Sequence, residues 1–268
     1  MIDRSEKIVW LARLGFVARG VVYALLGYLA LSSSATQTVS SGQSGVLGYI
    51  QHIPGGVPIL FAASAGLLGY ALFRFSSAFL DIENRGTDAK GIATRTGHLC
   101  SGVLHLGLAW SALQFAIGSK QSAGDRTHDM VSTALGFELG PVALAIAGVA
   151  LVTGALFQAR EAFTLGFMKW VSPRAPTWSC WLGRAGYAAR AVVYVLIGWS
   201  LLRSAWSENS SEARSVGGAI LDLHEMGAIH TAVAAGLLLF GLFSLVIARY
   251  RIIPDPGRKF HAARQALS

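Results

Sequence analysis

The chain has 268 residues, of which 53% are hydrophobic and 13% are charged. Soluble domains carry about 25% charged residues, so this composition excludes an ordinary soluble domain and indicates a membrane protein. The formal net charge is +8, but the basic residues form short clusters between long apolar runs, and this distribution argues against nucleic acid as a partner.

Six apolar stretches are long enough to cross a bilayer, because a spanning helix needs about 20 mostly apolar residues. In chain order they are residues 14–32, 57–80, 97–118, 141–165, 185–204 and 227–248. The first stretch has some features of a secretory signal peptide, but Arg19 interrupts it and the same pattern recurs near Trp181. We therefore expect the first stretch to be a retained helix.

Lysine and arginine fall mainly on one side of these helices. Eighteen of the 22 lie in the N-terminal segment, the second and fourth loops, the C-terminal tail and the adjoining helix ends. Cytoplasmic loops carry the excess of such residues in membrane proteins. We expect a multi-pass membrane protein with both termini in the cytoplasm.

The helices repeat in pairs. The odd-numbered helices read RLGFVARGVVYALLG from Arg13, RTGHLCSGVLHLGLA from Arg95 and RAGYAARAVVYVLIG from Arg184. The even-numbered helices repeat more weakly, with Phe73, Phe157 and Phe243 in register. Because every unit crosses the membrane twice, the units share one orientation, and a symmetry axis between them runs along the membrane normal.

The expected fold is therefore all-α: a polytopic bundle of six transmembrane helices, built as three tandem helical hairpins around a pseudo-threefold axis. The repeats are assigned to residues 1–88, 89–172 and 173–268, the last with a basic cytoplasmic tail, within one integral membrane domain. A short half-apolar segment precedes each even helix, at residues 48–56, 132–141 and 219–227. We expect these segments to lie in the outer interface as amphipathic turns.

Small residues recur along the odd helices. In membranes such residues let helix backbones approach closely, where lipid offers no hydrophobic drive for association. The residues expected to pack helices in this way are Gly15, Gly20, Gly97, Gly102 and Gly186.

These motifs resemble the bacterial DUF1206 family of uncharacterised membrane proteins. That family's odd helices read near R-x-G-[aromatic]-x-x-R-G-V-V-Y, and its even helices near P-x-G-x-x-L-L-x-x-x-x-G-L-x-x-Y-A. The first repeat carries the odd motif at Arg13, Gly15, Phe16, Arg19, Gly20, Val21, Val22 and Tyr23, and the even motif at Pro54, Gly56, Gly66, Leu67, Tyr70 and Ala71. The resemblance runs from about Trp10 to Arg251 and implies three two-helix repeats, but no activity.

The middle repeat departs from the odd-helix motif. Ser101 stands where the other repeats have the second arginine, and His98 and His105 replace the two aromatic residues. A role that needs three equal arginines is therefore not expected.

Arginines of the odd helices are the first candidates for function, since ionisable groups inside a membrane are costly. Arg19 and Arg190 lie six residues, about 9 Å of helix, beyond Arg13 and Arg184. Each either reaches back to the interface by snorkelling or faces the bundle and binds an anionic group. The candidate residues for binding an anion or lipid headgroup are Arg13, Arg19, Arg95, Arg184 and Arg190.

A second candidate group consists of His98, His105 and Glu161, as an intramembrane polar site. The alternative for the histidines is substitution within a packed face, and for Glu161 an interfacial ion pair beside Arg160. The cysteines, Cys100 and Cys180, lack the spacing of a metal site. Asp222, His224 and Glu225 have the residue types of one, but a single cluster in a short outer loop favours solvated polarity. No catalytic motif occurs in its required context, so we expect no enzyme, metal or cofactor.

Three functions remain in competition. The favoured one is a non-enzymatic membrane module that binds anionic lipids of the bilayer, another membrane protein or a second copy of itself. The first alternative is a small transporter or channel with its path at the repeat interface. The second alternative is a haem-binding redox protein that uses His98, His105 or His230.

Overall fold

The computed structural model describes residues 4–32, 42–119 and 127–253. Within these ranges the regular elements are helices, apart from one isolated β-bridge between Val171 and Arg251. Six helices are long and apolar enough to cross a membrane: α1 (Arg4–Leu31), α4 (Gly56–Phe79), α5 (Ala89–Ala116), α7 (Gly140–Thr164), α8 (Ser179–Ser207) and α10 (Ala228–Tyr250). The predicted six-helix, all-α membrane fold is confirmed.

Three helices begin well before the apolar stretches that predicted them, and the first of these is α1, which starts at Arg4 rather than at residue 14. Helix α5 starts at Ala89, where the Asp88 side chain accepts a hydrogen bond from the backbone N–H of Gly91, and α8 starts at Ser179. Their first turns are polar, so an apolar window misses them although the backbone is already helical. The basic tail at 254–268, Lys120 and Arg126 lie outside the described residues.

Short helices overlap or border the half-apolar segments that precede the even helices. They are α3 (Gly42–His52), α6 (Thr127–Leu135) and α9 (Val216–Asp222), the last followed by the single turn η4 (His224–Met226). Helix α3 packs against α1, α4, α5 and α9, and the Gln51 amide donates to the carbonyl of Phe115 at 2.8 Å. The interfacial position of these segments stays a prediction.

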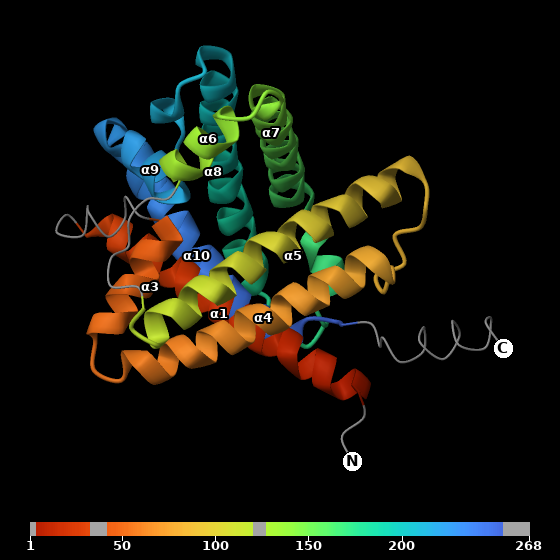
Figure 1. The fold of residues 1–268 in the computed structure, drawn as a ribbon. Helices are drawn as coiled ribbons and strands as arrows, with labels where there is room; N and C mark the ends of the chain where they lie inside the picture. The colour runs from red at the N-terminus through yellow and green to blue at the C-terminus, as the bar shows by residue number, and fades with distance from the viewer. Residues whose placement is uncertain (1–3, 33–41, 120–126, 254–268) are drawn as a thin grey trace.

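Helix neighbours follow the threefold pattern of the sequence. The even helix of each repeat packs against the odd helix of the next, as α4 on α5, α7 on α8 and α10 on α1. Within the first and third repeats, α1 also packs on α4 and α8 on α10. Figure 1 shows the α4/α5 pair inclined to the α7/α8 pair, with α1 and α10 between them.

The middle repeat breaks this pattern, because α5 and α7 do not pack against each other in the described part of the chain. The ring of six helices is therefore open between these two. The buried share of the apolar span is 61% for α1 and 56% for α10, but 28% for α5 and 17% for α7. Phe157 of α7 is accordingly 56% exposed, whereas its counterparts Phe73 and Phe243 are buried.

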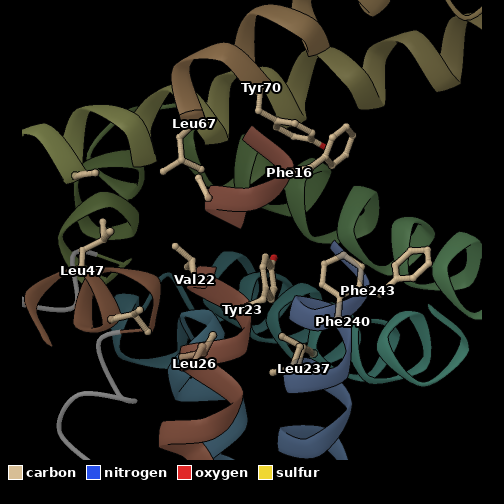
Figure 2. Close-up of a cluster of buried hydrophobic side chains, with 14 of the residues drawn as sticks. Phe16, Val22, Tyr23, Leu26, Leu47, Leu67, Tyr70, Leu237, Phe240 and Phe243 are labelled. Carbon is tan, nitrogen blue, oxygen red and sulfur yellow. The ribbon is translucent and has the colours of Figure 1, made fainter. Parts of the chain in front are cut away.

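The core of the bundle lies between α1, α4 and α10 and is rich in aromatic rings (Figure 2). The Phe16 and Tyr70 rings meet edge to face with centroids 5.1 Å apart, and Tyr23 meets Phe240 in the same way at 5.1 Å. Edge-to-face pairs of this kind stabilise a core beyond their buried area. They also place the phenol groups of Tyr23 and Tyr70 inside the bundle.

Glycines set the distances between these helices. A Cβ atom at Gly15 would lie 2.3 Å from the Cβ of Tyr70, and one at Gly186 would lie 2.6 Å from the Cβ of Phe240. Gly20 and Gly102 also lie at close contacts, with Leu245 and Phe75. The expectation for Gly97 was wrong, because nothing lies within 4 Å of its Cβ position and the residue is exposed. Its side of α5 has no partner helix, since the middle repeat is open.

We predict that Gly15→Ala separates α1 from α4 and lowers the free energy of unfolding by about 1–3 kcal/mol, as overpacking does. Thermal unfolding of the detergent-solubilised protein, followed by circular dichroism, measures the change. The matched control is Gly97→Ala, which adds the same methyl group where space is open and should leave the melting temperature unchanged. Equal melting temperatures for the two variants would contradict this description of the packing.

Candidate functional site: a buried cluster of guanidinium groups

Arg19 of α1 faces the inside of the bundle. Its side chain is 8% exposed, and its guanidinium carbon lies 5.0 Å from the ring centroid of Phe16, 5.2 Å from Tyr70 and 5.1 Å from Phe240. Its Nη1 donates to the Tyr70 hydroxyl at 2.9 Å, and its buried Nε has no acceptor among the described residues. Arg19 therefore faces the inside of the bundle and does not reach back to the interface by snorkelling.

Tyr70 of α4 accepts hydrogen bonds from two arginines. Besides Arg19, Arg74 donates to the same hydroxyl oxygen from Nε at 2.9 Å and from Nη2 at 2.6 Å. Nη1 of Arg74 donates to Nδ1 of His98 at 2.9 Å. One phenol oxygen thus receives three charged donors, although a phenol is only a modest acceptor.

Arg190 of α8 occupies the position equivalent to Arg19 in the third repeat. Its guanidinium carbon lies 4.4 Å from the Phe240 centroid and 5.7 Å from that of Tyr23, and Nη2 donates to the Tyr194 hydroxyl. The Gln158 amide, turned so that its oxygen faces Arg190, accepts from Nη2 at 3.0 Å and from Nη1 at 3.2 Å. Arg19 and Arg190 therefore share one aromatic ring, that of Phe240.

The charges of this cluster do not balance. Among the described residues, no carboxylate lies within ion-pair distance of Arg19, Arg74 or Arg190. Their partners are phenols, an amide, an imidazole and aromatic faces, which stabilise a cation less than an anion does. Buried charges are ordinarily paired, because an unpaired one is costly in an apolar environment.

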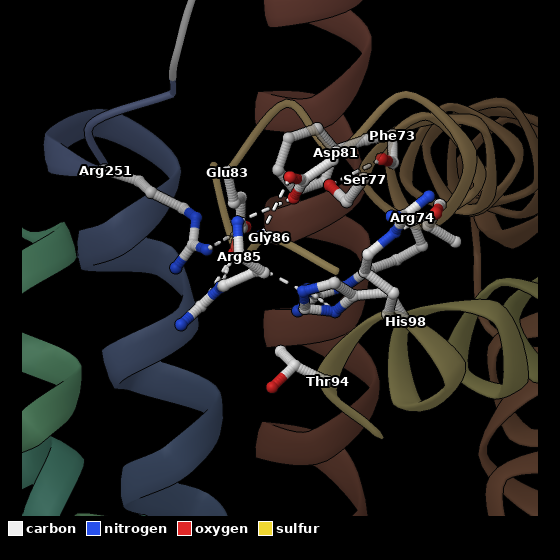
Figure 3. A network of polar contacts seen from close by, with 12 residues as sticks. Phe73, Arg74, Ser77, Asp81, Glu83, Arg85, Gly86, Thr94, His98 and Arg251 are labelled. Carbon is white, nitrogen blue, oxygen red and sulfur yellow. Dashed lines mark hydrogen bonds and ion pairs between the residues drawn. The ribbon is translucent and has the colours of Figure 1, made fainter. Parts of the chain in front are cut away.

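Glu83 provides the only carboxylate beside this cluster in the described part of the chain, just beyond the end of α4 (Figure 3). Its side chain is 1% exposed and contacts Arg85 at 2.8 Å, Arg251 at 3.1 Å and Nε2 of His98 at 3.4 Å. Burial alone would raise the pKa of Glu83, but the His98 imidazole and the charges of Arg74 and Arg251 outweigh it and hold that pKa far below its usual range. Glu83 is therefore ionised, and it forms ion pairs with Arg85 and Arg251.

The first arginine of the odd-helix motif has a different environment from the second. Arg13 donates from Nη1 to the carbonyls of Ala248 and Arg249 at the end of α10, at 2.7 and 2.5 Å. Arg95 donates to the carbonyls of Ala78 and Phe79 at the end of α4, at 2.7 and 3.2 Å. Cations and donors at a helix C-terminus satisfy its free carbonyls. Headgroup binding by these two residues stays a prediction.

Arg184 contacts the face of the Trp181 ring, with 5.6 Å between the guanidinium carbon and the ring centroid. It is half-buried, and no described residue accepts a hydrogen bond from its guanidinium. A role in binding an anion at this position also stays a prediction.

Of the predicted intramembrane polar site, the structure brings two members to the cluster. His98 lies between Arg74 and Glu83, and the His105 ring contacts the Tyr70 ring with centroids 4.5 Å apart and planes tilted by 53°. Nδ1 of His105 contacts the carbonyl of Ser101 at 2.7 Å. Glu161 is separate, beside the turn at Gly166 that follows α7. His230, the third histidine considered for haem, lies beside His224 instead, with ring centroids 5.1 Å apart.

Sequence reasoning missed several members of the cluster. Arg74 and Gln158 directly follow Phe73 and Phe157, the aromatic residues in register in the even helices, and Ser244 follows Phe243. A polar residue at one position of three apolar helices is a signal that could have identified this site. Glu83 and Arg251 lie beyond helix ends, where a charged residue usually reads as solvated. The described residues contain no group of three His, Cys, Asp or Glu that could hold a metal ion.

We predict that Glu83→Gln lowers the free energy of unfolding by about 3–5 kcal/mol at pH 7, because it leaves a buried guanidinium without its counter-charge. Since folding lowers the pKa of Glu83, its ionised form stabilises the protein above the pKa of an unfolded Glu, about 4.3, and this contribution is lost in stronger acid. The difference between wild type and variant should therefore shrink below about pH 4.

Denaturant unfolding in detergent, followed by circular dichroism across this pH range, measures the effect. The matched control is Glu212→Gln, which removes a carboxylate paired with the 56% exposed side chain of Arg203. That change should cost less than about 1 kcal/mol. A Glu83→Gln protein as stable as the control variant at pH 7 would show that this carboxylate is not the counter-charge on which Arg85 and Arg251 depend.

Comparisons with known proteins give a family and no activity. The family described as Domain of Unknown Function (DUF1206) matches the chain in three tandem segments, at residues 14–81, 96–164 and 185–251. An uncharacterised protein of Bacillus subtilis (strain 168), YxxB, is 29% identical over 259 residues, which cover 92% of this chain and 94% of that protein. No solved structure matches. With three matched segments that span most of its length and six apolar helices arranged in pairs, the chain belongs to the DUF1206 family.

Proposed function

We propose that this chain is a non-enzymatic membrane module that binds an oxyanion of the phosphate class inside its helix bundle, between Arg19 and Arg190. The observation that carries the proposal is the unbalanced charge: Arg19, Arg74 and Arg190 are gathered around Tyr70 and Phe240 without a carboxylate among the described residues. A bound anion would supply the missing negative charge.

The donors of these arginines support the proposal. Nε of Arg19 is buried and has no acceptor among the described residues, so one donor of a 92% buried side chain remains available for a ligand. The guanidinium carbons of Arg19 and Arg190 lie 5.1 and 4.4 Å from the centroid of the Phe240 ring. The distance between the two carbons is therefore at most the sum of these values. A phosphate offers several oxygens and is bound by planar guanidinium donors, often in pairs.

We also propose that the bundle lies in the bacterial inner membrane with both termini in the cytoplasm. The distribution of Lys and Arg supports this orientation. It places Arg19 and Arg190 in the half of the membrane nearer the cytoplasm, within about 9 Å of Arg13 and Arg184 along their helices.

Green fluorescent protein fused to either terminus tests the orientation, because it becomes fluorescent in the cytoplasm and stays dark when exported unfolded. Both fusions should fluoresce. A dark fusion at one terminus with a bright one at the other would contradict an even number of crossings.

The binding proposal is tested by thermal unfolding in detergent with added phosphatidylglycerol, an anionic lipid, or phosphatidylcholine, which has no net charge. A ligand that binds only the folded state stabilises it by about 2.7 kcal/mol at a hundred times its dissociation constant. We expect phosphatidylglycerol to raise the melting temperature of the wild type, and phosphatidylcholine to raise it much less. The double variant Arg19→Gln, Arg190→Gln should lose this difference.

The matched control is Arg160→Gln on α7, which removes one positive charge from an exposed side chain. It should respond to phosphatidylglycerol as the wild type does. If the double variant fails to fold, the single variants Arg19→Lys and Arg190→Lys keep the charge but remove the planar donor pair, and each should weaken the response. An undiminished response in the arginine variants would reject the site.

A further inference from the structure

Both ends of the helix ring are covered. At the end where α4, α7 and α10 finish, the Arg251–Glu83 ion pair spans two helices, and the backbone N–H groups of Ser172 and Ile252 donate across the same end to Tyr250 and Trp170 at 2.8 Å. At the opposite end, α3 and α9 pack over α1 and α10, with Leu47, Ile50 and Ile220 fully buried. A ligand of the guanidinium cluster therefore has no open route along the axis through the described residues.

The side of the ring is open between α5 and α7. The helices that flank this opening each contribute a polar residue to the cluster: the ring of His105 on α5 contacts the ring of Tyr70, and Gln158 of α7 accepts hydrogen bonds from Arg190. Toward the membrane, α5 and α7 present apolar side chains such as Leu104, Trp110 and Ile146.

The sequence explains why the opening lies in the middle repeat. Arg19 contacts Tyr70 within the first repeat, and Arg190 contacts Phe240 within the third. With the even helices aligned on Phe73, Phe157 and Phe243, the middle repeat has Ser101 and Gly154 at the positions of this arginine–aromatic pair. A hydroxymethyl group and a hydrogen atom cannot bridge two helices, so nothing replaces the contact that closes the other hairpins.

We propose that the oxyanion bound by Arg19 and Arg190 belongs to a phospholipid that enters sideways from the membrane between α5 and α7, with its acyl chains along their apolar faces. This inference rests on the proposed function and adds the class of ligand and its route. The positive charges of Arg19 and Arg190 favour a ligand with an anionic headgroup. Because the opening between α5 and α7 faces the membrane, the ligand should be one that reaches it through hydrocarbon. A free inorganic anion would have to cross that hydrocarbon without its hydration shell, which is costly.

Gly154 offers a way to test the route without changing a charge. A Cβ atom there would meet only the Tyr194 ring, at 3.5 and 3.9 Å, so the site has room for a side chain beside Arg190. Gly154→Phe places an aromatic ring where the other two repeats carry Tyr70 and Phe240. It should occupy the space that the lipid needs.

The matched control is Gly107→Phe on α5. Nothing lies within 4 Å of a Cβ atom at Gly107, and two residues of helix place it on the opposite side of α5 from His105. The same bulk is thus added at a position that faces away from the cluster. If Gly154→Phe fails to fold, Gly154→Leu serves as a smaller obstruction.

The experiment measures binding of phosphatidylglycerol, a phosphodiester, and of glycerol phosphate, a phosphate monoester without acyl chains, by native mass spectrometry of the full chain. We expect the wild type and Gly107→Phe to retain phosphatidylglycerol, and Gly154→Phe to bind it about tenfold more weakly, which corresponds to 1.4 kcal/mol. Glycerol phosphate at the same concentration should not displace the lipid.

Two results overturn the lateral route while leaving the anion site in place: unchanged lipid binding by Gly154→Phe or Gly154→Leu, or displacement of the lipid by an equal concentration of glycerol phosphate. A third result concerns the site itself. If the double variant Arg19→Gln, Arg190→Gln retains phosphatidylglycerol as the wild type does, the proposed function fails and this inference fails with it.

Discussion

Positive charge inside an apolar bundle is the constraint on which the rest of this structure depends. Three guanidinium groups, those of Arg19, Arg74 and Arg190, are held by aromatic rings, phenol oxygens and an amide in the middle of six apolar helices. Glu83 forms ion pairs with Arg85 and Arg251 at one end of the cluster, and no carboxylate of the described residues lies within ion-pair distance of the inner three arginines. The protein keeps this arrangement although hydrocarbon makes it costly, which is why we connect it with binding.

The threefold repeat provides the cluster, and its one irregular copy gives access to it. The first and third repeats each close their hairpin through an arginine on the odd helix and an aromatic ring on the even helix. The middle repeat has small residues at both positions, and its helices α5 and α7 separate. The middle repeat therefore lacks the arginine–aromatic contact, and its two helices lie apart, whereas those of the first and third repeats pack together.

Hydropathy and repetition were sufficient to predict the six helices, their threefold repeat and the family, because lipid requires long apolar helices and duplicated segments keep similar residues at matching positions. They did not predict that α5 and α7 of the middle repeat lie apart. They also singled out Arg19, Arg190, His98 and His105. The role of Tyr70 and Glu83 could not be predicted, since a tyrosine in a helix and a glutamate in a loop are common and only tertiary packing buries them together. Gly97 shows the opposite error, because alignment with Gly15 gives no sign that its neighbouring helix is absent.

A structure determined by electron cryomicroscopy, with the protein in nanodiscs of phosphatidylglycerol, tests the central claim most directly. Our account predicts density for a phosphate within hydrogen-bond distance of the guanidinium groups of Arg19 and Arg190, continuous with acyl chains that leave the bundle between α5 and α7. It would be contradicted by a map in which a carboxylate from another part of the chain pairs with these two arginines, or in which they contact only protein and no anion.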